Sequence, residues 1–381
     1  MERCEYILPK KKRKCRMLRK SGKRFCGEHM VHDPDNLDRI PCPNDPKHTV
    51  LTSELDQHLT KCNSRIQEHP WLEEFVNQSI KSSLTPEFVR PTAAEVGEVI
   101  KKVNEIYNEI KECFEVPIDP DFQYEDIREA ADVLNDKKKL HLRQIDSIIG
   151  CLSRHSLLEN VDSECLIDLG SGKARLVYWM SKKFPKTKYL LVDRMGARNK
   201  FDRKAIKEDD SLQIERLRCS VEHLKLGQVP SLQESNSVVA VCKHFCGAAT
   251  DYGIRCLLNG EKEGLRLTGF ALAPCCHHKC VKEEFVGNEF LKEHGITSDS
   301  QFSALRHVST WNCCGFENKE GASTDKTDDE REELGVRAKR ILEYARVEYL
   351  RSAGFDVELI QYVDRRVSPE NLLIVGKKRN E

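Results

Sequence analysis

The chain has 381 residues, of which 39% are hydrophobic, which is enough for one large domain with a buried core and smaller modules beside it. The formal net charge is zero, and no apolar run reaches the length that a membrane span requires. Seventeen cysteines without a recognisable secretory signal favour reduced thiols and metal ligands over a disulfide framework, so we expect a protein of the nucleus or cytoplasm that does not insert into a membrane.

The first thirty residues are strongly basic, because they hold eleven Lys or Arg residues against three Glu residues. This excess predicts a polyanionic partner, with a solvated basic tail as the alternative. The run Pro-Lys-Lys-Lys-Arg-Lys at 9–14 also matches a short nuclear-import signal. The same lysines could instead lie along RNA phosphates, and the sequence leaves both interpretations open.

Residues 1–31 contain a first set of metal-ligand residues. Their spacing is C-x10-C-x10-C-x2-H, formed by Cys4, Cys15, Cys26 and His29. The loops between them are short, basic and poor in apolar residues, so they cannot bury enough surface to fold alone. A tetrahedral zinc ion held by three thiolates and one imidazole would supply the missing free energy. The alternative is a disordered basic arm with incidental cysteines.

Residues 39–66 contain a second set, with the spacing C-x5-H-x9-H-x3-C, formed by Cys42, His48, His58 and Cys62. His58 and Cys62 are four residues apart, so both face the same way on a helix that should begin near Ser53. The segment has no apolar surface large enough to hold such a helix by itself. We therefore predict a second structural zinc ion here.

The order of these two patterns resembles a known family of RNA-modifying enzymes. The first pattern resembles the Cys/Cys/Cys/His finger at the start of the eukaryotic tRNA 2'-O-methyltransferases that modify the fourth nucleotide of the acceptor stem. The second resembles the CHHC finger of that family and of a minor-spliceosome protein, where it is taken to bind RNA. The resemblance implies two fingers that grip RNA ahead of a domain that uses S-adenosylmethionine (SAM).

Residues 70–125 are expected to form a helical connector. Apolar residues at helical spacing between Thr92 and Phe114 predict an amphipathic helix. A second apolar stripe, from Leu142 to Leu152, comes just before the first predicted strand. We expect these helices to pack on the sheet and to have no catalytic role.

Residues 126–381 carry the pattern of a Rossmann-like α/β domain. At 166–172 the run Leu-Ile-Asp-Leu leads into Gly-Ser-Gly, which indicates a buried strand that ends in a tight turn, and 173–184 reads as a helix. Glycines at such a turn let the backbone approach a ligand closely, and the next helix offers its N-terminus. This pattern predicts a nucleoside-cofactor site.

A second strand, 188–192, ends in an acidic residue. A carboxylate there can accept hydrogen bonds from both hydroxyls of a ribose. The turn and the acid do not distinguish NAD from SAM. The predicted cofactor-binding residues are Asp168, Gly170, Ser171, Gly172 and Asp193.

The end of the chain favours SAM over NAD. Methyltransferases of the Rossmann-like class close their sheet with a terminal helix and a strand hairpin, whereas a dehydrogenase would continue with parallel βα units. Residues 317–333 are highly charged and are expected to form a mobile acidic loop before that helix. The predicted elements are strands at 214–218, 237–242 and 267–273, a helix at 334–353, and strands at 356–363 and 371–375.

Two polar clusters follow the fourth and fifth predicted strands, Lys-His-Phe-Cys-Gly at 243–247 and Pro-Cys-Cys-His-His-Lys-Cys at 274–280. Both should face the cofactor, because open α/β sheets bind ligands beyond the carboxyl ends of their strands. Methyl transfer to a ribose hydroxyl needs an in-line acceptor and removal of its proton. We assign Lys243 to steady the developing alkoxide and His244 to take the proton. An ordinary hydrogen-bonded histidine is the alternative for His244.

Both clusters, with Ser-Pro-Glu-Asn at 368–371, also resemble the tRNA 2'-O-methyltransferase family. The resemblance thus covers nearly the whole chain apart from the connector and the acidic loop. It implies that SAM is the cofactor, that the tRNA acceptor stem is the partner, and that the product carries a 2'-O-methyl group on the cytidine or adenosine at the fourth nucleotide. The sequence indicates no protein partner.

Two other functions and one more metal site remain open. The Pro-Cys pair ending at Cys275 resembles the nucleophile of cytosine C5 methyltransferases, so an RNA cytosine C5 methyltransferase is the second candidate. A non-catalytic RNA-binding adaptor with a degenerate methyltransferase fold is the third. A third zinc ion could take ligands from residues 275–280, with Cys242, Cys246, Cys313 and Cys314 as further thiols that could approach in space.

Overall fold

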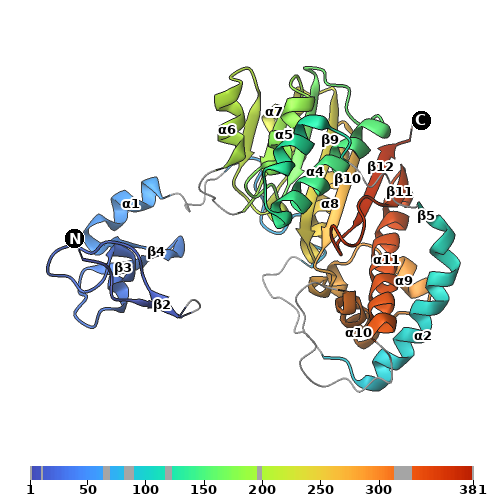
Figure 1. Ribbon diagram of the computed structural model, residues 1–381, viewed down its shortest axis with the longest axis horizontal. Helices are drawn as coiled ribbons and strands as arrows, with labels where there is room; N and C mark the ends of the chain where they lie inside the picture. Colours follow the sequence, from blue (N-terminus) through green and yellow to red (C-terminus); the bar gives the residue numbers. More distant parts are fainter. Residues whose placement is uncertain are drawn as a thin grey trace. The chain divides into compact units, whose positions relative to one another are not determined.

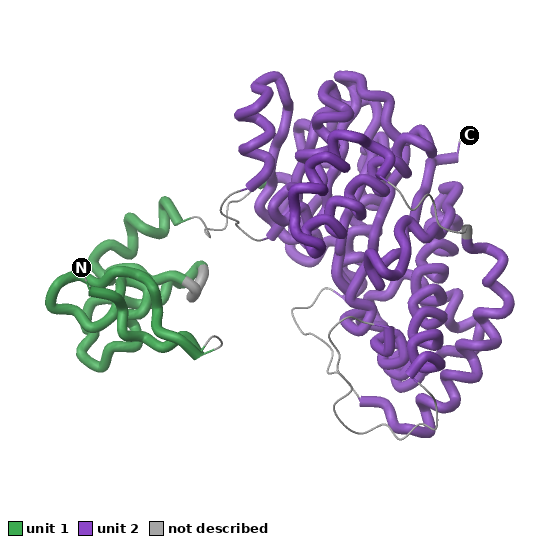
Figure 2. The backbone as a smooth tube through the Cα atoms, in the orientation of Figure 1, with its two compact units in different colours: residues 1–69 green, residues 70–381 purple. Residues whose placement is uncertain are grey.

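The computed structural model describes residues 2–9, 12–62, 69–80, 90–115, 122–194, 200–312 and 328–379, without the side chains of residues 45–47 and 115. The chain divides into two units, Met1–His69 and Pro70–Glu381 (Figure 2). The first unit holds both predicted fingers. The second holds the α/β domain together with residues 70–125, which we had predicted as a separate connector.

The first unit has short elements and few apolar residues to bury. The core of its first half consists of Phe25 and the three cysteines Cys4, Cys15 and Cys26. Helix α1 begins at Leu55, two residues after the predicted start near Ser53. Among the described residues, its elements are the hairpin β1 (Ile7–Leu8) and β2 (Arg13–Lys14), the 3-10 helix η2 (Gly27–His32), the hairpin β3 (Arg39–Cys42) and β4 (Asp45–Leu51), the 3-10 helix η3 (Thr52–Glu54), and α1 (Leu55–Lys61).

The second unit is built on one sheet whose described strands run in the order β5-β11-β12-β10-β9-β6-β7-β8 (Figure 1). Strand β12 is antiparallel to both its neighbours, and the other pairs are parallel. This confirms the predicted closing hairpin. The strands are β5 (Phe114–Glu115), β6 (Glu164–Leu169), β7 (Lys188–Val192), β8 (Ile214–Leu217), β9 (Ser237–Cys246), β10 (Leu267–Cys275), β11 (Phe355–Gln361) and β12 (Leu372–Lys378).

Helices cover both faces of this sheet, and the side chains of a strand alternate between the two layers. In β6, Ile167 packs into a core shared with α2, α8, α10 and α11, whereas Leu166 packs into a core shared with α3, α4 and α5. The helices are α2 (Ala93–Ile110), α3 (Glu125–Asp132), α4 (Asp136–Arg154), α5 (Arg175–Lys183), α6 (Phe201–Glu208), α7 (Pro230–Gln233), α8 (Ala248–Lys262), α9 (Asn288–Glu293), α10 (Asp299–Ser309) and α11 (Asp328–Ser352).

Helix α2 matches the predicted amphipathic stretch. It starts from a capping box in which Thr92 accepts a hydrogen bond from the amide of Glu95, and the Glu95 carboxylate accepts one from the amide of Thr92. Its apolar side, including Val99 and Val103, is completely buried in the sheet's core. The expectation that this segment packs on the sheet is therefore correct.

The predicted acidic loop at 317–333 is wrong over its last six residues, because α11 begins at Asp328 instead of Leu334. Asp328, Asp329 and Glu330 occupy the first turn of the helix, where negative charges interact favourably with the exposed amide groups. These acidic residues, which the sequence analysis placed in a loop, thus belong to the helix. Residues 313–327 lie outside the described residues.

In the described part of the chain, no helix combines the length and the apolar character that crossing a membrane would require.

Candidate catalytic site and metal centres

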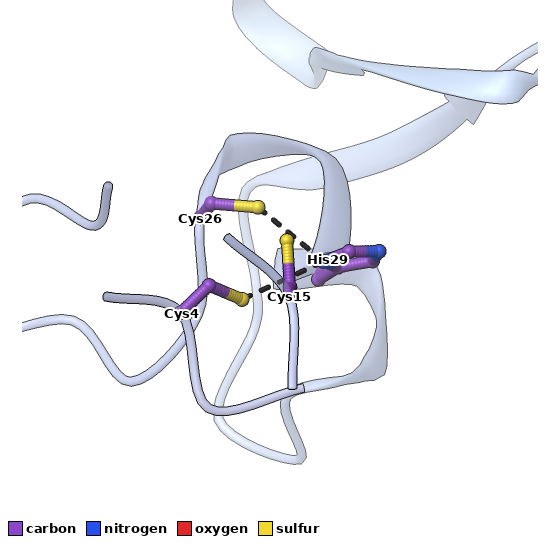
Figure 3. A group of neighbouring side chains, drawn as sticks. All are labelled: Cys4, Cys15, Cys26 and His29. Carbon is purple, nitrogen blue, oxygen red and sulfur yellow. Dashed lines mark hydrogen bonds between the residues drawn. The ribbon is translucent and has the colours of Figure 1, made fainter. Parts of the chain in front are cut away.

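Three cysteines and one histidine of the first unit converge on one point (Figure 3). Cys4, Cys15 and Cys26 are buried, and the ligand atoms of all four residues lie within 4.8 Å of one another. His29 Nδ1 is 3.5 Å from Cys4 Sγ and 3.4 Å from Cys26 Sγ. With Zn–S bonds of about 2.3 Å and Zn–N bonds of about 2.0 Å, a tetrahedral site places S and N about 3.5 Å apart. The group therefore fits one zinc ion.

The position and the protonation state of His29 both suit a metal ligand. The amide of His29 donates to the Cys26 carbonyl, which starts η2 beside the last cysteine. The Tyr6 ring stacks on the imidazole with the ring centroids 4.2 Å apart. Burial, together with the nearby His32, lowers the pKa of His29, so the neutral imidazole that zinc requires is favoured.

The second finger brings together Cys42, His48, His58 and Cys62, again with all ligand atoms within 4.8 Å. The two sulfurs are 3.7 Å apart and the two Nε2 atoms 3.2 Å apart. Tetrahedral zinc predicts about 3.8 Å and about 3.3 Å for these two edges. Strands β3 and β4 supply the first two ligands, α1 supplies His58, and Cys62 follows directly after α1.

The carboxyl ends of β6 and β9 form the point where the strand order of the sheet reverses. From β6 the chain builds outward to β7 and β8, and then returns to the other side of β6 as β9 and β10. In open α/β sheets, ligands bind in the crevice outside the strand ends at such a point. All the predicted cofactor and catalytic residues lie at the ends of β6, β7 and β9.

The turn after β6 has the conformation that its glycines allow. Gly170 and Gly172 have φ values of +74° and +49°, a region that other residues rarely adopt. A Cβ atom at Gly170 would lie 3.0 Å from the Phe245 ring, which belongs to β9. The Gly172 amide donates a 2.7 Å hydrogen bond to Asp193 Oδ2. Asp193 therefore joins the end of β7 to the turn.

Arg216 is a candidate binding residue that the sequence analysis missed. Its guanidinium lies across the turn, donating from Nη1 to Ser171 Oγ at 2.9 Å and to the Gly172 carbonyl at 3.3 Å, while Nε donates to Asp202 at 2.6 Å. The third nitrogen, Nη2, is buried without a hydrogen-bond partner among the described residues. The sequence did offer one signal for this residue, because Arg216 is a charged residue within the apolar-alternating strand predicted at 214–218.

These features fit SAM. Gly170 and Gly172 carry no side chains at the turn, the N-terminal end of α5 follows it, and Arg216 Nη2 offers a donor that an acceptor on a bound ligand would satisfy. When bound, SAM supplies a methyl group on a positively charged sulfur. The remaining chemistry belongs to the side chains around it.

Lys243 and His244 lie where β9 departs from regular pairing. Strand β9 continues four residues beyond its predicted end at Cys242, and its pairing with β10 skips His244, so that Ala273 pairs with Lys243 and Pro274 with Phe245. His244 has a φ of +65°. Such a bulge beside a site re-aims side chains away from the regular alternation.

The Lys243 amine is buried and makes no hydrogen bond within the described residues. Burial lowers its pKa to about 8, although Cys275 and Asp168 favour its charge. Burial likewise raises the pKa of Asp168 to about 7, opposed by Arg216. The strand ends thus hold an amine and a carboxyl group that both titrate near neutral pH, as groups in active sites often do.

His244 is less suited to its predicted role than Lys243. Its Nε2 lies 3.0 Å from Oε1 of Gln144, which fixes the ring. Displacement of water by neighbouring atoms, and then the charge of Lys243, lower the pKa of His244 to about 4. A base with such a low pKa accepts a proton poorly at neutral pH.

The cysteine-rich segment after β10 divides into two environments. Cys275 and Cys276 group with Cys246 of β9, and the Cys246 and Cys275 sulfurs are 3.0 Å apart. Cys280 instead contacts Arg346 at 3.1 Å. Of the thiols considered for a third zinc site, the structure brings Cys246 together with Cys275 and Cys276 within 4.8 Å and leaves Cys280 apart. Cys313 and Cys314 lie outside the described residues.

The geometry also bears on Cys275 as a nucleophile. The side chain is buried, and the hydrogen bond with Cys246, together with burial, raises the pKa of Cys275 above the ordinary value for a thiol. The thiolate is the reactive form, so this thiol is poorly activated.

A network of buried charged residues holds the segment after β10 in place. Arg346 of α11 donates to both carboxylate oxygens of Asp251, at 3.0 and 2.9 Å, and to Glu343 at 2.6 Å. Glu343 lies 2.7 Å from His277 Nε2. The network thus connects α8, α11 and the loop after β10 through buried hydrogen bonds.

Three family models match the chain. They are the CCCH zinc finger in TRM13 protein over residues 2–30, the U11-48K-like CHHC zinc finger over residues 39–63, and Methyltransferase TRM13 over residues 143–377. The last covers more than half of the chain.

The similar curated proteins span nearly the same length. The tRNA:m(4)X modification enzyme TRM13 homolog of Mus musculus is 31% identical, over 98% of this chain and 94% of its own. The proteins called tRNA:m(4)X modification enzyme TRM13 in Kluyveromyces lactis and Yarrowia lipolytica are 29% and 31% identical, over 99% of this chain and 96% and 90% of theirs. The chain therefore belongs to the TRM13 methyltransferase family, with two zinc fingers ahead of a SAM-dependent methyltransferase fold.

Proposed function

We propose that this protein transfers the methyl group of SAM to a ribose 2'-hydroxyl of tRNA, at the fourth nucleotide of the acceptor stem. The names of the relatives describe tRNA modification enzymes of the m(4)X type. The observation that carries the ribose assignment is the Lys243 amine, which is buried, without a hydrogen-bond partner among the described residues, and positioned at the sheet's reversal point. A ribose hydroxyl is a weak acid, and its methylation needs such a group.

In this proposal Lys243 takes the proton in place of His244. Lys243, with its pKa near 8, is neutral often enough to accept the proton of the hydroxyl, and the resulting ammonium then sits beside Asp168. His244, fixed by Gln144 and weakly basic, positions the acceptor strand instead of taking the proton. The turn at Gly170–Gly172 holds the cofactor in line.

The first unit is proposed to hold the RNA. A groove on its first finger is lined by five basic residues, Arg3, Arg13, Lys14, Arg16 and Arg19, and by two acidic ones, Glu2 and Glu5, which pair with Arg19. Basic side chains in a groove can contact several phosphates, and A-form RNA is recognised mostly through its shape and backbone. Lys10 and Lys11 of the proposed import signal lie outside the described residues. We propose a nuclear or cytoplasmic location, because zinc-bound fingers need reduced cysteines.

Alkaline hydrolysis of the product tests the position of the methyl group. The full-length, zinc-loaded protein is incubated with unmodified tRNA and SAM carrying a labelled methyl group. We expect the label in one alkali-resistant dinucleotide that begins at nucleotide 4, because cleavage of an RNA linkage needs a free 2'-hydroxyl. Label in the mononucleotides that alkali releases would overturn the ribose assignment.

Two variants separate the candidates within the same assay. Lys243→Met should abolish transfer while retaining SAM binding, and Lys292→Met, at an exposed lysine paired with Glu289, should behave like the natural protein. Cys275→Ala should retain transfer. Loss of transfer with 5-methylcytidine formed only by the natural protein would favour the cytosine C5 mechanism, and SAM binding without transfer to any tRNA would favour the adaptor.

A further inference from the structure

Three cysteine sulfurs gather at the edge of the sheet where the cofactor site lies. Cys246 ends β9, Cys275 ends the neighbouring strand β10, and Cys276 follows it. Cys246 is exposed, Cys276 is partly exposed, and Cys275 is buried. Cys246 and Cys275 are direct partners across the two strands. The proposed methyl transfer uses none of these thiols.

The distances in this group differ from those in the two zinc fingers. The sulfurs of Cys42 and Cys62 are 3.7 Å apart, close to the tetrahedral edge of about 3.8 Å, whereas those of Cys246 and Cys275 are 3.0 Å apart. The shorter distance does not fit two ligands of one zinc ion. It does place the two sulfurs so that a small rotation of the side chains would bring them into bonding distance.

We propose that Cys246 and Cys275 form an oxidisable dithiol whose disulfide weakens SAM binding. The oxidant is a small-molecule disulfide of the glutathione type. The Cys246 thiolate attacks it, forming a mixed disulfide and releasing one thiolate. The Cys275 sulfur then displaces the second, so that two protein thiols lose two electrons and two protons and the small disulfide becomes two thiols.

The chemistry of Cys246 suits the first step. The hydrogen bond from Cys275 lowers the pKa of Cys246 to about 6, so its thiolate is present at neutral pH, and the side chain is accessible. Reactive cysteines combine these two properties. Cys275, buried behind it, is the resolving thiol. Once the Cys246 sulfur is in the mixed disulfide, the hydrogen bond to it that raises the pKa of Cys275 is lost, and Cys275 is better able to attack.

The backbone connects this pair to the glycine turn. Phe245 directly precedes Cys246, and its ring closes against Gly170, where a Cβ atom would be only 3.0 Å away. On the other side, the Gly247 amide donates to the Cys275 carbonyl at 2.9 Å. The segment is thus anchored on both sides. A disulfide at Cys246 would therefore constrain the residue next to Phe245, whose ring packs against the cofactor turn.

Peptide mapping tests the bond directly, independently of any activity on tRNA. The full-length, zinc-loaded protein is treated with oxidised glutathione, its remaining thiols are blocked, and it is cut with trypsin. Cleavage after Lys243, Arg255, Arg266 and Lys279 gives peptides 244–255 and 267–279. We expect these two peptides as one linked species that separates on reduction. Cys276→Ser should retain the link, and Cys275→Ser should abolish the natural one.

SAM affinity, measured by titration calorimetry, tests the consequence. Oxidation should raise the Kd for SAM by about tenfold, and reduction should restore it. Cys246→Ser should remove this response, whereas Cys113→Ser, at an exposed cysteine of another surface, should keep it. Zinc release is followed in parallel, so that only samples with intact fingers are compared.

Three results would overturn the proposal. The first is the absence of the linked peptides at an oxidised-to-reduced glutathione ratio that oxidises Cys246 to a mixed disulfide. The second is an unchanged Kd in protein that carries the link. The third is a third zinc ion per chain that disappears in Cys246→Ser, since it would make the group a metal site. Failure of the ribose assignment would leave all three readouts unaffected.

Discussion

Lys243 has surroundings that make its role measurable. Its amine is faced by Asp168, Arg175 and Cys275, and burial holds its pKa near 8, below the ordinary value of 10.5. A lysine that accepts the substrate proton must first be neutral. A lysine that only stabilises a developing negative charge must be protonated. The two roles therefore predict opposite dependences on pH.

We predict that the single-turnover rate of methyl transfer rises about tenfold per pH unit below pH 8 and levels off above it, because the neutral fraction of the amine follows this course. The measurement is a pH–rate profile with saturating SAM and tRNA. Lys243→Arg, which stays charged, should lose the rising limb together with most of the activity. A rate that falls above pH 8 in the natural protein would assign Lys243 to charge stabilisation instead.

Asp193 should contribute to SAM affinity both through the ribose and through the turn. Replacing it with Ala removes a charged acceptor and the 2.7 Å hydrogen bond from the Gly172 amide, so we predict a loss of about 1–3 kcal/mol in SAM binding. Calorimetry measures the loss. Asp193→Asn keeps an acceptor for Gly172, so it should cost less. Asp210→Ala, at an exposed site nearby in sequence, serves as the control, and an equal effect of all three would dismiss the proposed role.

At the scale of elements, the network of Asp251, Glu343 and Arg346 holds α8 and α11 together beneath the site. All three side chains are buried, and removing the guanidinium would leave Asp251 without its ion-pair partner and Glu343 with His277 only. We predict that Arg346→Met lowers the free energy of unfolding by about 3–5 kcal/mol. Urea unfolding of the natural and variant proteins, followed by circular dichroism, checks this.

Arg351→Met is the matched control for that experiment. It removes a guanidinium from the same helix, but one that is a third exposed, pairs with Glu348 and donates to the Val357 carbonyl of β11. Because no buried carboxylate loses its partner, the loss should be smaller, about 1–2 kcal/mol. Equal losses in the two variants would mean that the buried network is no more important than any pair on α11.

The elements also show what the sequence alone could predict. Apolar runs that end in Gly or Asp predict strands β6 and β7, the glycine turn and the closing hairpin. The predicted fold class is confirmed. The extension of β9 through Cys246 could not be predicted, because Lys243 and His244 interrupt its apolar run and its bulge at His244 depends on pairing with β10. Arg216 was missed for a similar reason, since only the folded sheet brings it across the turn.

At the scale of the whole molecule, we expect the two units to differ in what holds them folded and in what they bind. The first has too small an apolar core to fold without metal, whereas the second has two extensive cores of its own. We predict that deleting residues 1–69 leaves SAM affinity unchanged and reduces both tRNA affinity and its dependence on salt. Filter binding at several salt concentrations measures both. Unchanged tRNA binding would refute the role of the fingers.

A point variant refines this test. Arg13→Gln combined with Arg16→Gln removes two charges from the groove without removing a predicted zinc ligand. If both contact phosphates, the slope of log affinity against log salt should fall by about two. Atomic emission should still find two zinc ions per chain. A loss of zinc would mean that the variant damaged the finger itself.

The small strand β5 and helix α2 have a practical consequence for protein production. Strand β5 pairs with Leu359 and Ile360 of β11 and so caps that border of the sheet, while α2 covers apolar residues of α10 and α11. A truncated form that begins at residue 126, or at the start of the matched methyltransferase region, would lose both. Its uncovered strand and apolar surface would invite aggregation. Soluble expression of the catalytic half should therefore require a start near residue 70.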